Sequence, residues 1–277
     1  MAERARYTLG TFGLEIGMVA VAAVFAFPVY VLVVLAFKPR TEWAQSPLSL
    51  PVELYLGNFA EAWEKAYLAD ALISSVVILV ASLMILVVAG SLGGFFLARC
   101  LPRLGNALYF MFLAGMILPF QLALIPLYQN MRDIHLLGSP VSLILFHGGI
   151  HLPLALFLYT GFIRTIPRAY EEAARIDGAS DFQVFALVVF PMLRPVTGTV
   201  LILCGVFTWN DFMTALLYLS GSDWATVPVT IYSFVDQYIT EWGIVFASLL
   251  IGIAPVLLVF LLLQRHMIKG FTSGIKG

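Results

Sequence analysis

Long apolar runs separated by short polar segments dominate this chain of 277 residues. A helix that crosses the hydrocarbon core of a bilayer needs ~20 mostly apolar residues, and the runs reach that length. Uncharged runs of this length do not form strands of a soluble domain, and the strands of outer-membrane barrels alternate instead. We therefore predict an all-α, polytopic membrane protein with six transmembrane helices in one domain, 1–277. The predicted spans are 14–37, 71–98, 107–129, 141–163, 196–219 and 243–263.

Several of these spans contain proline. A proline inside a helix removes a backbone hydrogen bond and kinks the helix, and membrane helices tolerate such breaks where neighbouring groups satisfy the backbone. Kinked spans are compatible with a transport path that opens. The prolines are at positions 28, 119, 126, 153 and 255.

A polar loop, 164–195, lies between the fourth and fifth predicted spans. Pro167 suits the first turn of a helix, where its missing N–H is not needed. Glu171 and Glu172 follow, and negative charge in the early turns is favourable beside the positive end of the helix dipole. Gly178 indicates the end of this helix, because glycine tolerates a positive φ.

A second short helix is predicted directly after this glycine. Ser180 can cap its first turn, and Gln183, three residues further on, completes a capping box. The polar loop therefore predicts a helix, a glycine turn and a second helix.

The composition agrees with a membrane protein and excludes several other classes. Hydrophobic residues make up 61% of the chain and charged residues 11%, and the mean hydropathy is +0.96, far from the values of soluble domains. There is no basic stripe of the kind that nucleic acid requires. None of the four lysines follows a glycine in the pattern G-x-x-x-x-G-K, so we expect no nucleotide site on this chain. Cys100 and Cys204 lack the spacing of a disulfide or metal site.

Basic residues predict the orientation in the membrane. In the six-span arrangement, eleven fall on one side and four on the other, the four being Lys38, Arg40, Lys65 and Arg132. Because cytoplasmic loops carry the excess of Lys and Arg, both termini and the polar loop 164–195 are predicted to be cytoplasmic. The eleven are Arg4, Arg6, Arg99, Arg103, Arg164, Arg168, Arg175, Arg194, Arg265, Lys269 and Lys276.

Polar residues within the predicted spans form a second group of candidates, since a charge at depth is costly and tends to face a cavity or a partner. Asn210 and Asp211 lie in the fifth span, and His147 and His151, four residues apart, share a face of the fourth. Neighbouring helices or the outer headgroups can satisfy such groups, and lining a solute path is the alternative. The histidine spacing suits a metal, but no acidic or cysteine partner is close in sequence, so structural or pore-lining roles are favoured.

The segment 39–69 is the largest predicted external loop. It carries several aromatic residues, and aromatics near the edge of a span usually lie in the interfacial belt of the membrane. We therefore expect these side chains at the outer headgroups. They are Trp43, Tyr55, Trp63 and Tyr67.

The polar loop resembles a known signature. Glu172-Ala173-Ala174, followed after three residues by Gly178 and later by Pro191, resembles the EAA loop of bacterial ABC-importer permeases. The wording EEAARIDGAS is most similar to the carbohydrate branch, which includes the maltose and multiple-sugar permease subunits.

Other segments extend the resemblance to most of the chain. The sequence 209–212 resembles the W-N-x-(F/Y/L) element of sugar-importer permeases, the tail 264–277 resembles their C-terminal ending, and 126–140 is similar to their connection between the third and fourth spans. Two positions depart from the family pattern. Val188 stands where isoleucine is usual, and Phe190 stands where leucine precedes the proline.

The resemblance implies a set of partners and a coupling site. In that family the first helix of the loop docks into a groove on the cytoplasmic ATPase and passes its movement to the membrane helices. It implies a second homologous permease subunit, two ATP-binding subunits, an extracytoplasmic solute-binding protein and a place in the bacterial inner membrane. ATP and Mg would be used by the ATPase subunits, with no cofactor on this chain. The implied coupling residues are Arg168, Glu171, Glu172, Ala173, Ala174, Asp177, Gly178 and Pro191.

The expected function is therefore import of a carbohydrate by alternating access, and the candidates for its translocation path are Asn210, Asp211 and His151. An ion-coupled secondary transporter is an alternative, but it usually needs several buried ionisable groups. Asp211 is the single acid deep in a late span, and Glu15 lies at the edge of the first. A membrane scaffold that recruits a soluble partner through the same loop is a third possibility. The sequence does not indicate which sugar is carried.

Overall fold

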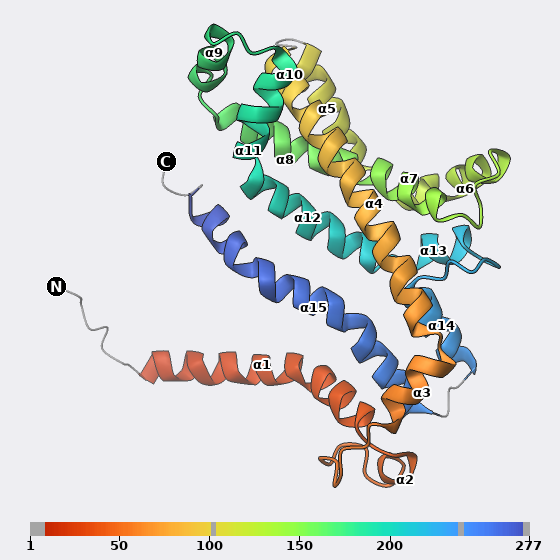
Figure 1. The fold of residues 1–277 in the computed structure, drawn as a ribbon. Helices are drawn as coiled ribbons and strands as arrows, with labels where there is room; N and C mark the ends of the chain where they lie inside the picture. The colour runs from red at the N-terminus through yellow and green to blue at the C-terminus, as the bar shows by residue number, and fades with distance from the viewer. Residues whose placement is uncertain (1–8, 101–103, 238–240, 274–277) are drawn as a thin grey trace. The chain divides into compact units, whose positions relative to one another are not determined.

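A computed structural model describes residues 9–100, 104–237 and 241–273, and within these ranges the chain is helical, with no strand (Figure 1). The predicted all-α fold is confirmed. The long and medium helices are α1 (Leu9–Ala36), α3 (Gly57–Lys65), α4 (Leu68–Phe95), α5 (Leu104–Ile117), α6 (Leu124–Asp133), α7 (Pro140–Ile150), α8 (Leu152–Thr165), α9 (Ala169–Ile176), α12 (Arg194–Trp209), α14 (Val227–Gln237) and α15 (Trp242–Ser273). The short elements are α2 (Arg40–Trp43), α10 (Asp181–Gln183), α11 (Phe190–Met192), α13 (Met213–Tyr218), the 3₁₀ helix η2 (Phe120–Ala123), and two π-helical stretches, η1 (Phe96–Cys100) and η3 (Val184–Val189).

Contacts between residues divide the chain into two compact units. The first, which we call the outer unit, comprises Met1–Leu68 and Ile231–Ile253. The second, the central unit, comprises Ala69–Thr230 and Ala254–Gly277. The single domain expected from the sequence stays a prediction.

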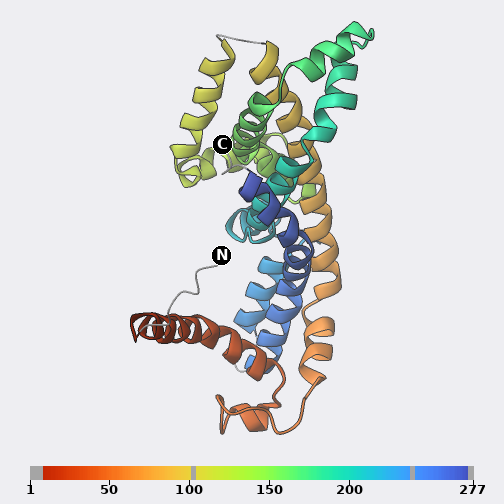
Figure 2. The ribbon, with the colours of Figure 1, turned by 90° about the vertical axis from the view of Figure 1, so that its left-hand side faces the viewer.

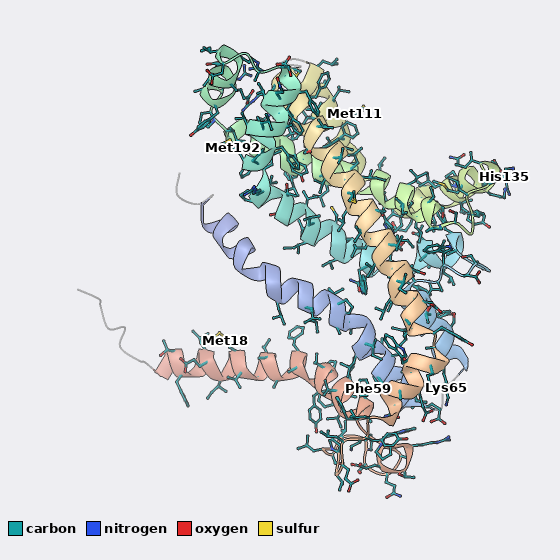
Figure 3. The ribbon with its side chains drawn as sticks, in the orientation of Figure 1. Met18, Phe59, Lys65, Met111, His135 and Met192 are labelled. Atoms are coloured by element: carbon teal, nitrogen blue, oxygen red, sulfur yellow. The ribbon has the colours of Figure 1, made fainter. Side chains whose placement is uncertain are left out.

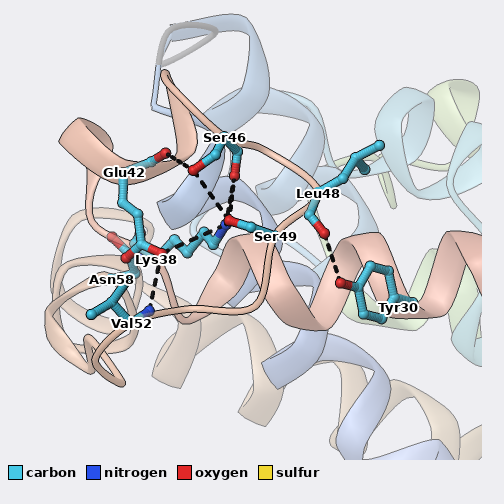
Figure 4. A network of polar contacts seen from close by, with 8 residues as sticks. All are labelled: Tyr30, Lys38, Glu42, Ser46, Leu48, Ser49, Val52 and Asn58. Atoms are coloured by element: carbon cyan, nitrogen blue, oxygen red, sulfur yellow. Dashed lines mark hydrogen bonds and ion pairs between the residues drawn. The ribbon is translucent and has the colours of Figure 1, made fainter.

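A buried lysine organises the loop after α1 in the outer unit (Figure 4). The Lys38 side chain is fully buried, and its Nζ donates to Ser46 O at 2.6 Å and to Ser49 Oγ at 2.8 Å. The Glu42 carboxylate lies 3.7 Å from the same nitrogen. Lys38 was one of the four basic residues assigned to the outer side, yet its charge is neutralised inside the loop and does not reach the surface.

The same loop is tied back to the end of α1 by α3. Asn58 Nδ2 donates to Ala36 O at 2.9 Å and to Lys38 O at 2.8 Å. The ring of Phe59, labelled in Figure 3, lies 4.8 Å from that of Phe37, centroid to centroid. These contacts satisfy carbonyl groups at the end of α1 that have no partner within the helix.

In the central unit, α4 packs closely against α8 through glycines. A Cβ placed on Gly94 would lie 2.7 Å from the Cβ of Tyr159, and one on Gly90 would lie 2.9 Å from the Cβ of Ala155. Small residues allow two membrane helices to approach to this distance, where backbone and side chains pack tightly. The two helices therefore form a closely packed pair.

The α4–α8 pair contributes to a hydrophobic core of the central unit. It is formed by α4, α8, η3, α12 and the segments that join them. Its buried members are Leu86, Phe95, Ala155, Tyr159, Ile163, Ile166, Val184, Phe185, Val189, Leu193, Val196, Val200 and Cys204.

Several predicted spans are interrupted in the structure. Within the described ranges, Gly10–Ala36 and Leu68–Cys100 are long and apolar enough to cross a membrane as single helices. Three more crossings are possible if bent helix pairs each count as one span: Leu104–Ile117 with Phe120–Asp133, Pro140–Ile150 with Leu152–Thr165, and Asp181–Met192 with Arg194–Trp209. The first part of α15, Trp242–Leu258, is a shorter apolar helical stretch. The number of six spans stays a prediction.

The structure differs from the sequence-based expectation in three of the predicted spans. Instead of a continuous helix over 107–129, the chain bends by 89° between Ile117 and Phe120. Pro119 explains the break, because proline disfavours helical geometry in the preceding residue and lacks the N–H. Instead of a continuous helix over 196–219, α12 ends at Trp209 and α13 begins at Met213. Instead of a continuous helix over 141–163, the chain bends by 43° between Ile150 and Leu152, and Pro153 lies in the first turn of α8.

Candidate functional site

The polar loop 164–195 contains the predicted helix, glycine turn and second helix. The first helix is α9, preceded by Arg168, so it begins two residues later than Pro167. Gly178 has a φ of 89° and makes the turn, a conformation in which other residues are strained. Ser180 and Gln183 form the predicted capping box, with Gln183 N 3.4 Å from Ser180 Oγ and Ser180 N 2.8 Å from Gln183 Oε1.

The second helix is more irregular than its capping box suggests. After α10, the backbone passes through the π-helical stretch η3 and then α11, where Pro191 lies in the first turn. π-Helical turns widen the helix and are frequent at functional sites. Val184, Phe185 and Val189 of η3 are buried in the core of the central unit.

Glu171 faces the inside of the protein. Its side chain is 3% exposed, and Arg99, itself 8% exposed, lies against it with Nε 2.6 Å from Oε1. The same guanidinium donates through Nη2 to Ile163 O at 2.9 Å and to Ile166 O at 2.7 Å. Arg99 is the residue that sequence reasoning missed at this site, because the sequence singled it out only as one of eleven cations predicted on the cytoplasmic side.

An ion-pair chain extends this buried pair to the surface. Arg175 Nη1 lies 4.0 Å from Glu171 Oε2, and Arg175 Nη2 lies 3.1 Å from Asp181 Oδ1. Asp181 is in the first turn of α10 and is highly exposed. The charged groups therefore connect α9 with the elements before and after it.

α9 and the residues at its two ends carry exposed groups of mixed character. Arg168, Glu172, Ala173, Asp177 and Gly178 are exposed, and Ala174 is partly buried. Large apolar side chains of α9 and α10 are exposed as well. They are Tyr170, which is 53% exposed, Ile176, which is 86% exposed, and Phe182, which is 71% exposed.

α9 lies at one end of the central unit. In both views α9 and α10 are next to the end of α4 that continues into η1 (Figures 1 and 2). Of the implied coupling residues, five are exposed: Arg168, Glu172, Ala173, Asp177 and Gly178. Glu171 lies inside, and Pro191 lies further along in α11.

The polar residues of the predicted spans form a second cluster in the central unit. The rings of His147 and His151 are stacked, with centroids 5.8 Å apart and planes at 6°. His147 Nε2 lies 3.4 Å from Asp211 Oδ2, and the ring of His151 lies 5.9 Å from that of the exposed Phe207. A small cavity of about 10 Å³, lined by His147 and Asp211 among others, is the size of one water molecule.

Asn210 does not join this cluster. It is exposed, follows the last residue of α12, and its side chain donates to Val206 O at 2.8 Å. Asp211 accepts a hydrogen bond from Thr214 N at 3.2 Å and so stabilises the start of α13. The structure thus brings Asp211 and His151 together through His147, a contact between distant segments that the sequence spacing does not reveal. Within the described ranges no group of three or more His, Cys, Asp or Glu side chains is arranged to hold a metal ion.

The C-terminal match can be followed only in part. α15 continues to Ser273, and residues 274–277 lie outside the described residues, as do Arg4, Arg6 and Arg103 of the orientation argument.

Cys100 and Cys204 are both free thiols.

Comparison with known sequences identifies the class of protein. Residues 90–272 match the family described as the binding-protein-dependent transport system inner membrane component. The matched segment holds both α9 and the histidine–aspartate cluster. The chain belongs to this family, whose members are transport components of the inner membrane that work with a solute-binding protein and an ATPase.

Individual relatives match over almost the whole chain. A melibiose, raffinose and stachyose import permease of Bacillus subtilis is 34% identical over 93% of this chain and 94% of the relative. A multiple sugar-binding transport system permease of Streptococcus mutans is 32% identical over 89% of this chain and 90% of the relative. A diacetylchitobiose uptake system permease of Streptomyces coelicolor is 32% identical over 86% of this chain and 80% of the relative.

A solved structure has the same fold. It is described as a bacterial ABC transporter involved in the import of the acidic polysaccharide alginate, and one of its chains superposes with a TM-score of 0.79. The match covers 94% of this chain and 99% of that chain at 20% sequence identity, so it shows the fold. The resemblance to ABC-importer permeases seen in the sequence is therefore confirmed.

Proposed function

We propose that this chain is a permease subunit of an ATP-driven importer that carries a sugar or oligosaccharide across the bacterial inner membrane by alternating access. The observation that carries the proposal is the exposed face of α9. This face displays a short helix with small residues, charges and large apolar side chains, and those features suit a groove on another protein. The named relatives are permeases for sugars such as melibiose, raffinose, stachyose and diacetylchitobiose, which supports the carbohydrate class.

The coupling mechanism depends on which subunits bind ATP. The chain has no phosphate-binding lysine loop, so ATP and Mg are bound by partner ATPase subunits, which we propose number two. A second homologous permease completes the pathway, and both termini face the cytoplasm. Closure of the ATPases moves α9, and the paired permeases change from inward- to outward-facing so that solute enters from the binding protein.

The histidine–aspartate cluster supplies a candidate for the translocation path. Asp211, His147 and His151 offer hydrogen-bonding groups, and Phe207 offers an exposed aromatic face beside His151. Sugars present both hydroxyl groups and apolar C–H faces, so this combination suits them. Asn210 is exposed on the same turn and can add an amide contact.

Uptake measured in proteoliposomes tests the proposal. The chain is reconstituted with its ATPase subunits, companion permease and binding protein, and labelled oligosaccharide uptake is followed with ATP inside the vesicles and no ion gradient. We expect uptake that requires both ATP and the binding protein. Uptake driven by a proton or sodium gradient without ATP would contradict the proposal and favour a secondary transporter.

The same uptake assay tests whether Asp211 lies in the translocation path. Asp211→Asn is expected to raise the solute concentration for half-maximal uptake several-fold, because a carboxylate accepts stronger hydrogen bonds than an amide. Asp133→Asn, an exposed acid on α6, is the matched control and should leave uptake unchanged. Equal uptake curves for both variants and the original chain would remove Asp211 from the path.

A further inference from the structure

We propose that Arg99 is a positioning residue that fastens α9 to the membrane helix α4, so that a displacement of α9 moves α4 and α8 with it. This inference rests on the proposed function, because it assigns the residue through which the coupling helix acts on the membrane helices.

The contacts of Arg99 join three elements. Arg99 lies in η1, the continuation of α4; its Nε donates to Glu171 Oε1 of α9 at 2.6 Å. Its Nη2 donates to Ile163 O at 2.9 Å and to Ile166 O at 2.7 Å, at the end of α8. The last carbonyl groups of a helix have no partner within it, so Arg99 also completes the end of α8.

Arginine suits this junction better than other residues. Its planar guanidinium presents several donors in a fixed arrangement, whereas the lysine ammonium is a point charge on a flexible stem. Both side chains of the pair are nearly buried, at 8% and 3% exposed. A buried ion pair adds little stability over apolar side chains of the same size, because both charges lose water. Its distinctive effect is to hold one orientation of α9.

The elements behind Arg99 are packed so that they move together. The glycines of α4 allow close contact with α8, as shown by the 2.7 Å between a Cβ on Gly94 and that of Tyr159. α9 meets this pair of helices through Glu171. Glu172, the next residue, is exposed. The two adjacent glutamates therefore have separate roles, since Glu171 anchors α9 inward and Glu172 faces the partner.

The test compares two double variants in the assembled transporter. Arg99→Met with Glu171→Met removes both charges and leaves no lone buried ion. Glu61→Met with Lys65→Met removes an exposed ion pair of 2.5 Å on α3 and serves as the matched control. The quantity measured is solute taken up per ATP hydrolysed, at equal amounts of assembled complex.

We expect the buried-pair variant to take up at least fivefold less solute per ATP than the original chain, while ATP hydrolysis continues. The control should give the original ratio. Arg99→Lys keeps the positive charge but loses the planar arrangement of donors. With Glu171 intact, this variant should give an uptake ratio between those of the buried-pair variant and the original chain. A merely structural role would lower the amount of complex and leave the ratio unchanged.

A distance measurement decides the question independently of transport. Spin labels are placed at the exposed positions Met84 on α4 and Ile176 on α9 in the full chain, after Cys100→Ser and Cys204→Ala. The distance distribution should be narrow with Arg99 and Glu171 present, broad in the buried-pair variant, and narrow in the control.

The outcomes separate this inference from the proposed function. An unchanged distance distribution in the buried-pair variant would overturn the role of Arg99, whatever the uptake ratio. If the buried-pair variant fails to assemble, the distance measurement on the purified chain decides alone. If the original chain shows no ATP-dependent uptake, the proposed function fails, and a distribution that broadens without the pair still supports Arg99 as the anchor of α9.

Discussion

At the scale of single residues, Glu171 and Glu172 are adjacent in sequence but have opposite surroundings. Glu171 is buried against Arg99, and Glu172 is exposed on the surface of α9. The resemblance to the family implies both glutamates as coupling residues and does not distinguish them. Burial, and not the signature, therefore distinguishes the anchoring carboxylate from the one available to a partner.

Neutralising each glutamate should have a different effect. Glu171→Gln leaves the buried Arg99 without a counter-charge, so we expect a loss of about 2–3 kcal/mol of stability, typical of a hydrogen bond to a charged group. Glu172→Gln should change stability by less than about 0.5 kcal/mol, as for most surface substitutions, yet reduce ATP-driven uptake. Thermal denaturation of the purified chain in detergent measures the first effect. Equal melting temperatures for the two variants would contradict the assignment.

At the scale of elements, the α4–α8 pair depends on glycine at the point of contact. Gly94 leaves no room for a methyl group, because a Cβ there would lie 2.7 Å from Tyr159 Cβ and 3.1 Å from Thr160 N. Gly161, on α8, has nothing within 4 Å of such a Cβ. The two glycines therefore share a helical setting and differ in packing.

Alanine at these two positions should act in opposite directions. Gly94→Ala is expected to destabilise the chain by about 1–3 kcal/mol, because overpacking forces the helices apart. Gly161→Ala should stabilise it by about 0.5–1 kcal/mol through helix propensity. Thermal denaturation in detergent again gives the comparison. A melting temperature for Gly94→Ala at or above that of Gly161→Ala would show that the close approach is not needed.

The elements of the polar loop were predictable because their signals are local. Gly178, Ser180 and Gln183 act on residues within one turn, and the structure confirms the turn and the capping box. The Arg99–Glu171 pair spans 72 positions in sequence, and no periodicity indicates it. The break after Trp209 was also missed, because apolar residues flank it on both sides and the hydropathy pattern continues across.

At the scale of the whole molecule, the chain is a transport component that relies on other proteins for energy and for solute delivery. The family match covers 90–272, which includes the polar loop, the histidine–aspartate cluster and most of α15. The roles of the individual site residues, the number of spans and the second permease remain proposals. The coupling mechanism depends on the contact between α9 and an ATPase.

Cross-linking through the cycle of ATP binding and hydrolysis tests that contact most directly. Ala173→Cys, on the exposed face of α9, is introduced into the assembled transporter after Cys100→Ser and Cys204→Ala, and Asp133→Cys, on α6, is the control. The account predicts a disulfide or bifunctional cross-link from position 173 to an ATPase subunit, with a yield that changes between the ATP-bound and nucleotide-free states, and none from position 133. An active transporter in which position 173 forms no cross-link to an ATPase subunit at any stage would contradict it.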